Sequence, residues 1–229
     1  MQGVPVMTID GPSGSGKGTV SRAAARKLGW ALLDSGALYR LVALGGRRAG
    51  IDLNDALQLG RLAQQLDIRF GSGPNGEEMV WLVGQEVSRD IRSEAAGNDA
   101  SKVAALPEVR SALLERQRRF AVAPGLVADG RDMGTVVFPD APVKIFLTAS
   151  ADERAARRYK QLKEKGVAAT LAALSREIAE RDQRDITRTA SPLVASEDAV
   201  LLDTTGMSVD AVVERVLEIA RERLSLGVL

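Results

Sequence analysis

A short glycine-rich segment near the N-terminus combines residue types that bind phosphate. It consists of Gly11, Pro12, Ser13, Gly14, Ser15, Gly16, Lys17, Gly18 and Thr19. An apolar run at residues 4–9 favours a buried strand before it, and residues 17–28 have the pattern of a helix. In such a strand-loop-helix unit, backbone N–H groups and the helix N-terminus face the anion, and the lysine reaches the outer phosphates. The segment therefore predicts a binding site for a nucleoside triphosphate.

One position departs from the commonest form of this pattern. A serine or threonine usually follows the lysine and binds Mg²⁺, whereas here Gly18 follows it and the hydroxyl comes at Thr19. We therefore expect phosphates and water to hold the metal, with Thr19 as a candidate for a direct protein ligand. The alternative, a plain turn between a strand and a helix, does not require glycine and lysine at these spacings.

The composition excludes several kinds of chemistry. The 229 residues include no cysteine and no histidine, which excludes disulfides, thiol catalysis and histidine-dependent catalysis or metal binding. Phosphoryl transfer suits the remaining carboxylates, lysines and arginines, because it depends on positioning and charge stabilisation. The net charge of +1 predicts no non-specific binding to nucleic acid. No apolar run is long enough to span a bilayer, so we expect no membrane association and a cytoplasmic location.

The pattern of strands and helices predicts an α/β fold. Further candidates for buried strands are residues 31–33, 126–128, 143–147 and 200–202, which makes five with the first. Helical stretches separate them and a last one covers residues 209–224, so we expect a five-stranded parallel sheet flanked by helices.

Ligands bind at the carboxyl ends of the strands in such a sheet. Asp10, Asp34, Asp129 and Asp203 fall at or just beyond these ends. Each could also be a helix cap or a turn residue, and for Asp203 this is the preferred interpretation.

A long excursion between the second and third core strands has a different pattern. Residues 68–70 and 79–83 flank a glycine-rich stretch at residues 71–76 and predict a hairpin, while residues 94–104 and 109–122 predict helices. We therefore expect a small α+β insert at residues 51–123 and a core domain made of residues 1–50 and 124–229.

Charged residues follow several of the core strands. Ser35 comes directly after the second strand, where it can cap a helix that carries Arg40. Asp129, Arg131 and Asp132 lie in a glycine-containing turn at the end of the third strand. Surface turns also collect such residues, but the position at the ligand edge of the sheet favours a binding role.

Two further groups of arginines recur at helical spacing. Alone, each is typical of a solvated helix face. A transferring phosphoryl group, however, carries charge on its equatorial oxygens, and an arginine placed there changes the rate by on the order of 10³. One group is Arg154, Arg157 and Arg158, and the other is Arg181, Arg184 and Arg188 with Asp185.

Taken together, six segments resemble the bacterial cytidylate (CMP) kinases over nearly the whole chain. The phosphate loop is shared with other nucleoside monophosphate kinases, whereas residues 101–107, residues 129–135 and the long insert make the resemblance specific. The six segments are residues 11–19, 34–40, 87–92, 101–107, 129–135 and 181–185.

The resemblance implies a P-loop NTPase core, a nucleoside-monophosphate-binding insert and a short helical lid at residues 152–190. It also implies transfer of the γ-phosphoryl group of ATP to CMP or dCMP, with Mg²⁺ as the cofactor. The expected partners are these nucleotides alone, bound by a monomer.

The resemblance also assigns roles to individual residues. It implies that Ser101, Arg110 and Asp132 bind the cytosine, and a carboxylate beside a guanidinium does complement the amino donor and ring acceptors of that base. It further implies that Arg181 and Asp185 hold the sugar. The phosphate-binding arginines are then Arg40, Arg131 and Arg188, the whole CMP set also includes Ser35, and the catalytic set is Lys17, Arg131, Arg154, Arg158 and Arg188.

Three alternatives share part of this pattern. A kinase for another nucleoside monophosphate or for shikimate has the same loop and a different insert. A GTPase-like switch requires an Asn-Lys-x-Asp motif, and none of Asn54, Asn75 and Asn98 begins one. A catalytically silent binding protein does not need the lysine and the arginines, all of which are present here.

Overall fold

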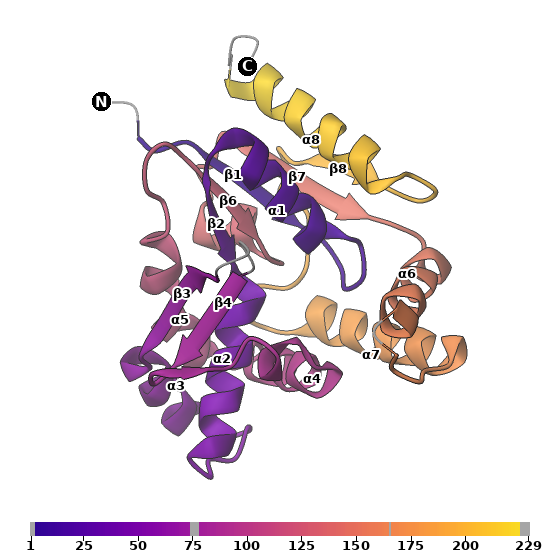
Figure 1. The fold of residues 1–229 in the computed structure, drawn as a ribbon. Coiled ribbons are helices and arrows are strands. Elements are labelled where there is room, and N and C mark those ends of the chain that lie inside the picture. Colours follow the sequence, from indigo (N-terminus) through magenta and orange to yellow (C-terminus); the bar gives the residue numbers. More distant parts are fainter. Residues whose placement is uncertain (1–2, 74–77, 165, 225–229) are drawn as a thin grey trace. The chain divides into compact units, whose positions relative to one another are not determined.

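The computed structural model describes residues 3–73, 78–164 and 166–224 (Figure 1). They form two compact units. The first consists of Met1–Asp34 and Arg118–Leu229, and the second is Ser35–Gln117. The second unit starts before residue 51, because helix α2 (Ser35–Arg48) packs on α3 (Ala56–Gln65) and α4 (Glu94–Val103).

The first unit is built on a five-stranded sheet in which every pair of neighbouring strands is parallel. Its strand order is β2-β6-β1-β7-β8, so the strand before the phosphate loop lies at the centre. The strands are β1 (Val6–Asp10), β2 (Ala31–Asp34), β6 (Leu126–Asp129), β7 (Val143–Thr148) and β8 (Val200–Asp203). The predicted fold class is therefore confirmed.

Helices α1 (Lys17–Leu28) and α8 (Val209–Leu224) lie side by side on one face of this sheet (Figure 1). Val20 and Ala24 of α1 and Val213 and Val216 of α8 pack with strand residues such as Ile9 into one apolar core. Burial of a side chain the size of valine or isoleucine stabilises the fold by about 1.5–3 kcal/mol, which anchors both helices on the sheet. The start of α1, and the loop before it, are thereby held at the carboxyl end of β1.

Two more helices, α6 (Ala151–Glu164) and α7 (Leu171–Thr187), follow β7 and pack against each other. Leu162 of α6 and Leu174 and Ile178 of α7 are buried. Helix α7 begins at the cap residue Thr170, whose side chain accepts a hydrogen bond from the N–H of Ala173. These helices cover most of the segment for which the sequence suggested a lid.

The turn predicted after β6 contains a π-helix, η2 (Met133–Val137). Gly134 faces β1 and β7, because a Cβ at this position would lie 2.9 Å from Oγ1 of Thr8 and 3.2 Å from Cδ of Lys144. Such a separation leaves no room for a side chain without a shift of the neighbours. The glycine therefore lets this turn lie directly against the sheet.

The second unit combines helices with a small antiparallel sheet. Strands β3 (Ile68–Ser72), β4 (Glu78–Leu82) and β5 (Gln85–Glu86) are in sequence order in the sheet. Leu41 of α2 and Leu82 of β4 belong to its core, and so do Val80, Val87 and Ile91. The short helix η1 (Asp90–Arg92) leads into α4.

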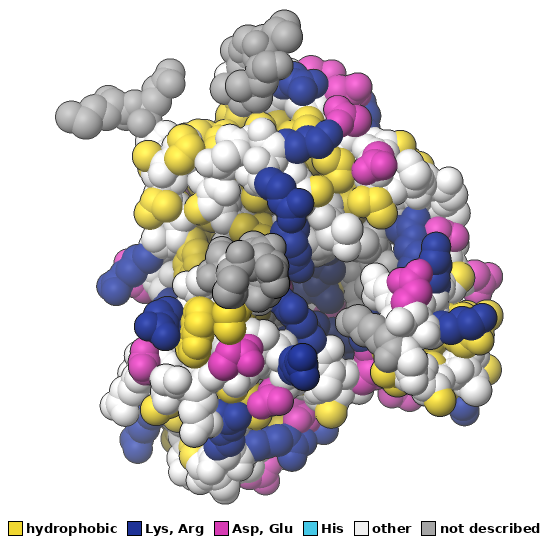
Figure 2. Space-filling model, in the orientation of Figure 1, with side chains coloured by type: hydrophobic (Ala, Val, Ile, Leu, Met, Phe, Trp, Pro, Cys, Tyr) yellow, Lys and Arg dark blue, Asp and Glu magenta, His cyan; other side chains and the backbone are white. Residues whose placement is uncertain are grey.

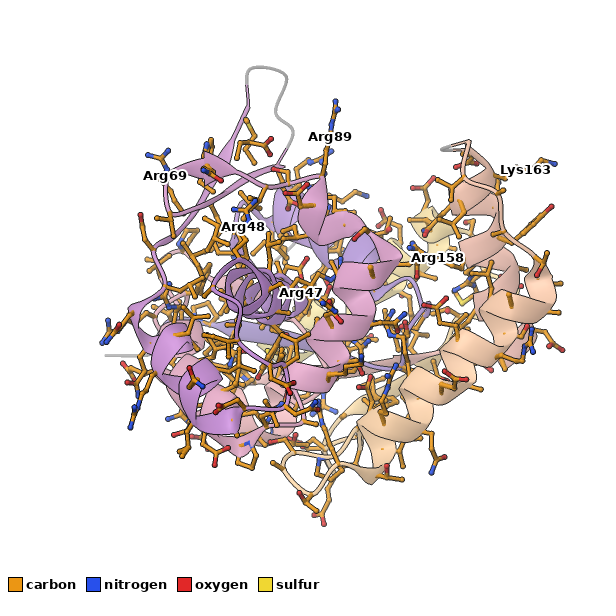
Figure 3. The ribbon with its side chains drawn as sticks, turned by 90° about the horizontal axis from the view of Figure 1, so that it is seen from below. Arg47, Arg48, Arg69, Arg89, Arg158 and Lys163 are labelled. Atoms are coloured by element: carbon orange, nitrogen blue, oxygen red, sulfur yellow. The ribbon has the colours of Figure 1, made fainter. Side chains whose placement is uncertain are left out.

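Ion pairs join the C-terminal end of α2 to the segments that follow β5 (Figure 3). Arg47 Nη2 donates to Asp99 Oδ1 of α4 at 2.8 Å, and a second bond joins Nε to Oδ2. Arg48 pairs with Asp90 at 3.3 Å. The guanidinium of Arg47 lowers the pKa of Asp99, mainly through the hydrogen bond. The two-pronged bond fixes how α2 and α4 lie on each other.

Several predicted boundaries in the second unit were wrong. Helix α5 covers Pro107–Arg118 rather than residues 109–122, since proline suits the first turn of a helix, where its missing N–H is not needed. Helix α4 ends one residue early, and the strands of the hairpin are β3 and β4, so Gly71 and Ser72 belong to a strand. Residues 74–76 of the predicted turn lie outside the described residues.

Charges of both signs are spread over the face drawn in Figure 2, in keeping with the net charge of +1. Every helix in the described part of the chain falls short of the length and hydrophobicity that a membrane-spanning segment requires.

Candidate active site

The glycine-rich loop connects the end of β1 to the start of α1. Gly11 has a φ of 147°, and a Cβ there would lie only 2.0 Å from the carbonyl oxygen of Leu147 on β7. Gly16, the cap residue of α1, is in the left-handed region with a φ of 88°. At Gly11 the backbone thus takes a path that a residue with a side chain cannot follow, and at Gly16 it takes one that such residues rarely adopt.

The N-terminus of α1 favours an anion. Its first turn contains no acidic residue, and its first intrahelical bonds start from the N–H groups of Thr19 and Val20, which donate to Gly16. The N–H groups that precede them in the helix are those that a bound anion ordinarily takes up.

Lys17, the first residue of α1, is buried and donates from Nζ to the carbonyl oxygen of Pro12 at 3.0 Å. Burial, followed by the nearby cation Arg131, lowers the pKa of Lys17 to about 7, while Asp129 acts in the opposite direction. A phosphate group at this loop would restore the charge of the ammonium, since an anion stabilises the protonated form.

Asp129 ends β6 and is buried beside the loop. A Cβ at Gly18 would lie 3.2 Å from its Oδ2, so this carboxylate takes up the space next to the position where related loops carry a hydroxyl. Burial raises the pKa of Asp129 to about 6, against the attraction of Lys17. The glycine that departs from the common pattern thus makes room for a carboxylate.

Two arginines of α6 donate to carbonyl groups of the loop. Arg154 is buried, and its Nη1 donates to the carbonyl oxygen of Ser13 at 3.0 Å and to Asp182 of α7 at 2.5 Å. Its Nε donates to the carbonyl oxygen of Ala149 at 3.1 Å. Arg157 donates from Nη1 to the carbonyl oxygen of Ser15 at 3.2 Å. Because the arginines bond these loop carbonyl groups, the N–H groups of the loop are left to bond the ligand.

Arg157 also reaches the loop after β8. Its Nη1 donates to Thr204 Oγ1 at 3.0 Å and its Nη2 to the Thr204 carbonyl oxygen at 2.6 Å, while Glu153 accepts from Nε at 2.9 Å. This side chain therefore connects the phosphate loop, α6 and the end of β8.

The turn after β6 and the end of α7 are joined by ion pairs. Arg131 Nε donates to Asp185 Oδ2 at 2.8 Å, and Arg188 Nη2 lies 4.0 Å from Asp132 Oδ1. The side chains of Arg188 and Asp132 are only 4% and 3% exposed. Burial is the largest single influence and would raise the pKa of Asp185, but the attraction and hydrogen bond of Arg131, with the attraction of Arg188 and Arg181, together lower it.

The remaining predicted residues belong to the second unit. Ser35 is the buried first residue of α2, and Arg40 of the same helix donates to the carbonyl oxygen of Ile91 at 2.9 Å. Arg110 of α5 is buried, lies 5.7 Å from the ring centre of Tyr39 and donates to Ala104 at 3.1 Å. Within the described residues, Oγ of Ser101 on α4 is buried without a hydrogen-bond partner.

The first unit therefore brings together most of its predicted residues. Lys17, Arg131, Arg181 and Asp185 act on one another electrostatically, and Arg154 contacts the loop. Arg158 differs, because it donates to Gln161 of its own helix at 3.1 Å (Figure 3).

The predicted set of site residues left out three that the structure connects to these elements: Asp10, Arg157 and Asp182. Asp203, by contrast, accepts from the N–H and hydroxyl of Thr205, which confirms its predicted role in a turn. Spacing alone cannot separate Arg157 from Arg154 and Arg158, since all three lie within about one turn and a half of helix. A strand-end position was the only signal for Asp10.

The phosphate loop lies between the central strand of a parallel sheet and a helix that begins with a buried lysine, and arginines bond to it. This arrangement defines a P-loop nucleotide-binding protein of the kinase type. The sequence profile of the family described as Cytidylate kinase matches residues 7–222. The chain therefore belongs to the cytidylate kinase family.

Individual relatives agree over nearly their full length. The chain is 58% identical over 221 residues to the cytidylate kinase of Stutzerimonas stutzeri (strain A1501), which covers 96% of both chains. It is 59% identical over 216 residues to that of Pseudomonas aeruginosa (strain LESB58), covering 93% of this chain and 94% of the relative. The cytidylate kinase of Nitrosococcus oceani is 59% identical over 215 residues, covering 93% and 95%.

Proposed function

We propose that the chain transfers the γ-phosphoryl group of ATP to CMP or dCMP, giving ADP and CDP or dCDP. The observation that carries the proposal is the cluster of buried charges at the carboxyl end of β1 and β6. There Lys17 of the phosphate loop lies within electrostatic reach of Arg131 and Asp185. Both belong to the residues predicted to bind CMP, here called the acceptor set. Membership of the cytidylate kinase family supports the same substrate class.

The donor nucleotide binds at residues 11–19 in this proposal. The N-terminus of α1 and Lys17 stabilise the phosphates, and the arginines Arg154 and Arg157 hold the loop carbonyl groups away from them. The loop is thus preorganised, so little reorganisation is needed when charge develops in the transition state.

The acceptor set is divided between the units. Asp132 contributes a buried carboxylate for the amino group of the base, and Ser101 contributes a hydroxyl whose oxygen has no bond within the described residues. Asp185 accepts from the sugar, while Arg131 and Arg188 neutralise phosphate charge. Ser35, Arg40, Arg110 and Arg181 complete the set.

The acceptor phosphate is the nucleophile and is already anionic at neutral pH. No general base is needed, which agrees with a chain that lacks histidine. The main task of the protein is to align two anions and offset their repulsion. Lys17, Arg131 and Arg188 do this in the proposal, and Arg158 of α6 is a further cation for the transferring group.

The residues present suit a magnesium ion that keeps most of its water. Among the described residues, no three carboxylates are grouped into a metal cage. Mg²⁺ at phosphates, however, needs only one or two carboxylates besides water, and Asp129 beside Gly18 offers one. Thr19 is exposed at the start of α1 and is the hydroxyl candidate. When bound, the ion supplies charge stabilisation to the phosphate oxygens.

Further parts of the proposal are a monomeric state, a cytoplasmic location, and use of free nucleotides rather than nucleic acid. The near-zero net charge supports the last point, because non-specific nucleic-acid binding depends on many phosphate contacts.

The test is a coupled assay of ADP formation from Mg-ATP. It is run without acceptor and then with CMP, dCMP, UMP, AMP, GMP and shikimate in turn. Turnover with CMP and dCMP, and little with the others, is the expected result. Preference for another acceptor would move the substrate assignment, and ATP hydrolysis without acceptor would point to a switch.

A variant separates base recognition from general damage. Loss of a hydrogen bond to a charged group costs about 1.5–3 kcal/mol, so Asp132→Ala should raise the KM for CMP roughly 10- to 100-fold with little change in the KM for ATP. Asp140→Ala is the matched control, because Asp140 is an exposed carboxylate nearby in the chain. An unchanged KM for CMP in Asp132→Ala would contradict contact with the base.

A further inference from the structure

Asp10 is a buried carboxylate whose two oxygens hold two consecutive N–H groups of a distant segment. It is the last residue of β1 and is 5% exposed. Oδ1 accepts from the N–H of Met133 at 2.9 Å, and Oδ2 accepts from the N–H of Gly134 at 2.8 Å. Met133 and Gly134 begin the π-helix η2, so Asp10 caps that helix from another part of the chain.

The bonds of η2 continue this arrangement to Asp132. The N–H groups of Val136 and Val137 donate to the carbonyl oxygen of Asp132 at 2.9 and 3.2 Å. Gly130 donates to Ile9 of β1 at 3.1 Å, so the turn is attached to β1 on both sides of Asp132. These bonds hold the backbone of Asp132 in place relative to β1, and the backbone in turn sets where its side chain begins.

The far end of η2 is held as well. Arg118 donates from Nε to the carbonyl oxygen of Val137 at 3.0 Å and from Nη2 to that of Val136 at 3.3 Å. The helix thus has a carboxylate at its N-terminal end and a guanidinium at its C-terminal end, which is the favourable order for its dipole.

A charged cap at this place has an energetic cost. Burial raises the pKa of Asp10 to about 7, although the two N–H groups lower it, and the carboxylates Asp132 and Asp129 add repulsion. Arg131 lies near enough to interact with Asp10. By contrast, Asp203 at the end of β8 is exposed and accepts from Thr205 in its own turn.

We propose that Asp10 is a positioning residue for recognition of the acceptor base, because it sets the place of Asp132 relative to the phosphate loop. This inference rests on the proposed function, in which Asp132 binds cytosine. The backbone of Asp10 leads directly into Gly11 of the phosphate loop, while its side chain holds the turn that carries Asp132. One residue therefore connects the ATP-binding loop with the turn predicted to bind the base.

The test is Asp10→Asn, which keeps the shape but presents an amide N–H₂ to one of the two N–H donors. The KM for CMP should rise about tenfold, and the preference for CMP over UMP in kcat/KM should fall by a similar factor. The KM for ATP should change less than about twofold, since the loop backbone is untouched. Hydrogen exchange of the Met133 and Gly134 amides should become faster. This measurement reports the loss of the Asp10 hydrogen bonds and needs no substrate.

Asp203→Asn is the matched control, with the same substitution at another strand end of the same sheet, and it should leave the KM for CMP unchanged. Asp10→Glu, which keeps two acceptor oxygens and the charge, should retain part of the CMP preference and serves if Asp10→Asn does not fold. Equal rises in the KM for CMP and for ATP, or an unchanged KM for CMP, would overturn the positioning role alone. Absence of CMP-dependent turnover in the unaltered protein would overturn the proposed function, and this inference with it.

Discussion

Truncation of Arg154 tests whether the ion pair between α6 and α7 is structural. In the pair with Asp182, the side chains are 9% and 16% exposed and the N–O distance is 2.5 Å. Removal of one partner from a buried pair costs about 3–5 kcal/mol, and the partial exposure here favours the lower end. For a chain of this size, about 3 kcal/mol corresponds to a Tm lower by roughly 6–12 °C.

The assay is thermal unfolding of Arg154→Met, with Arg158→Met as the matched control. Arg158 lies on the same helix and bonds to Gln161 at the surface, so its loss should cost no more than about 0.5 kcal/mol. The double variant Arg154→Met with Asp182→Leu should regain most of the lost stability, because an apolar pair replaces the ionic one.

Activity of the double variant adds a second readout. Recovery of both stability and turnover would mean that Arg154 acts mainly by holding α7, since a methionine cannot donate to Ser13, and recovery of stability alone would leave Arg154 in the catalytic set. A Tm of Arg154→Met within about 1 °C of the unaltered protein, or strict additivity with Asp182→Leu, would refute the reasoning.

Three more outcomes are expected. Lys17→Ala should abolish turnover while circular dichroism shows an intact fold, and near-normal activity would exclude the assigned role. Gly11→Ala should not give a folded protein, because its Cβ would meet the Leu147 carbonyl oxygen at 2.0 Å; normal yield and nucleotide binding would be the contrary result. Burial raises the pKa of Asp10 from 3.8 to about 7, so the nucleotide-free protein binds an extra proton when folded and should lose stability from pH 4 to pH 7. Asp10→Asn should flatten that part of the Tm curve, and an unchanged slope would speak against it.

Much of the fold could be predicted because local pattern and global arrangement agree. Helix α1 covers the predicted residues 17–28, and α8 the predicted 209–224, since both have an apolar face that must be buried on the sheet. All five core strands were found, with ends that differ by one or two residues. Prediction was weaker in the second unit, where the two-residue strand β5 has no alternating pattern of its own.

The phosphate loop could be predicted in detail for a different reason. Glycine at a positive φ and lysine at the helix start are local requirements, and Gly11 and Lys17 meet them through their own backbone and side chain. The roles in the acceptor set came from resemblance, because no local rule links Asp132 to a base. They remain predictions that the assays above test.

The sequence by itself determined the class of chemistry, through a loop that binds polyphosphate and a composition that leaves lysine, arginine and carboxylates to act. Only the tertiary structure decided which of three neighbouring arginines reach the loop, and that Asp10 caps a helix more than one hundred and twenty residues away, at 2.8–2.9 Å. The reason is physical: helix periodicity and backbone propensity act over a few residues, whereas these bonds depend on β1, β6 and β7 lying side by side in one sheet.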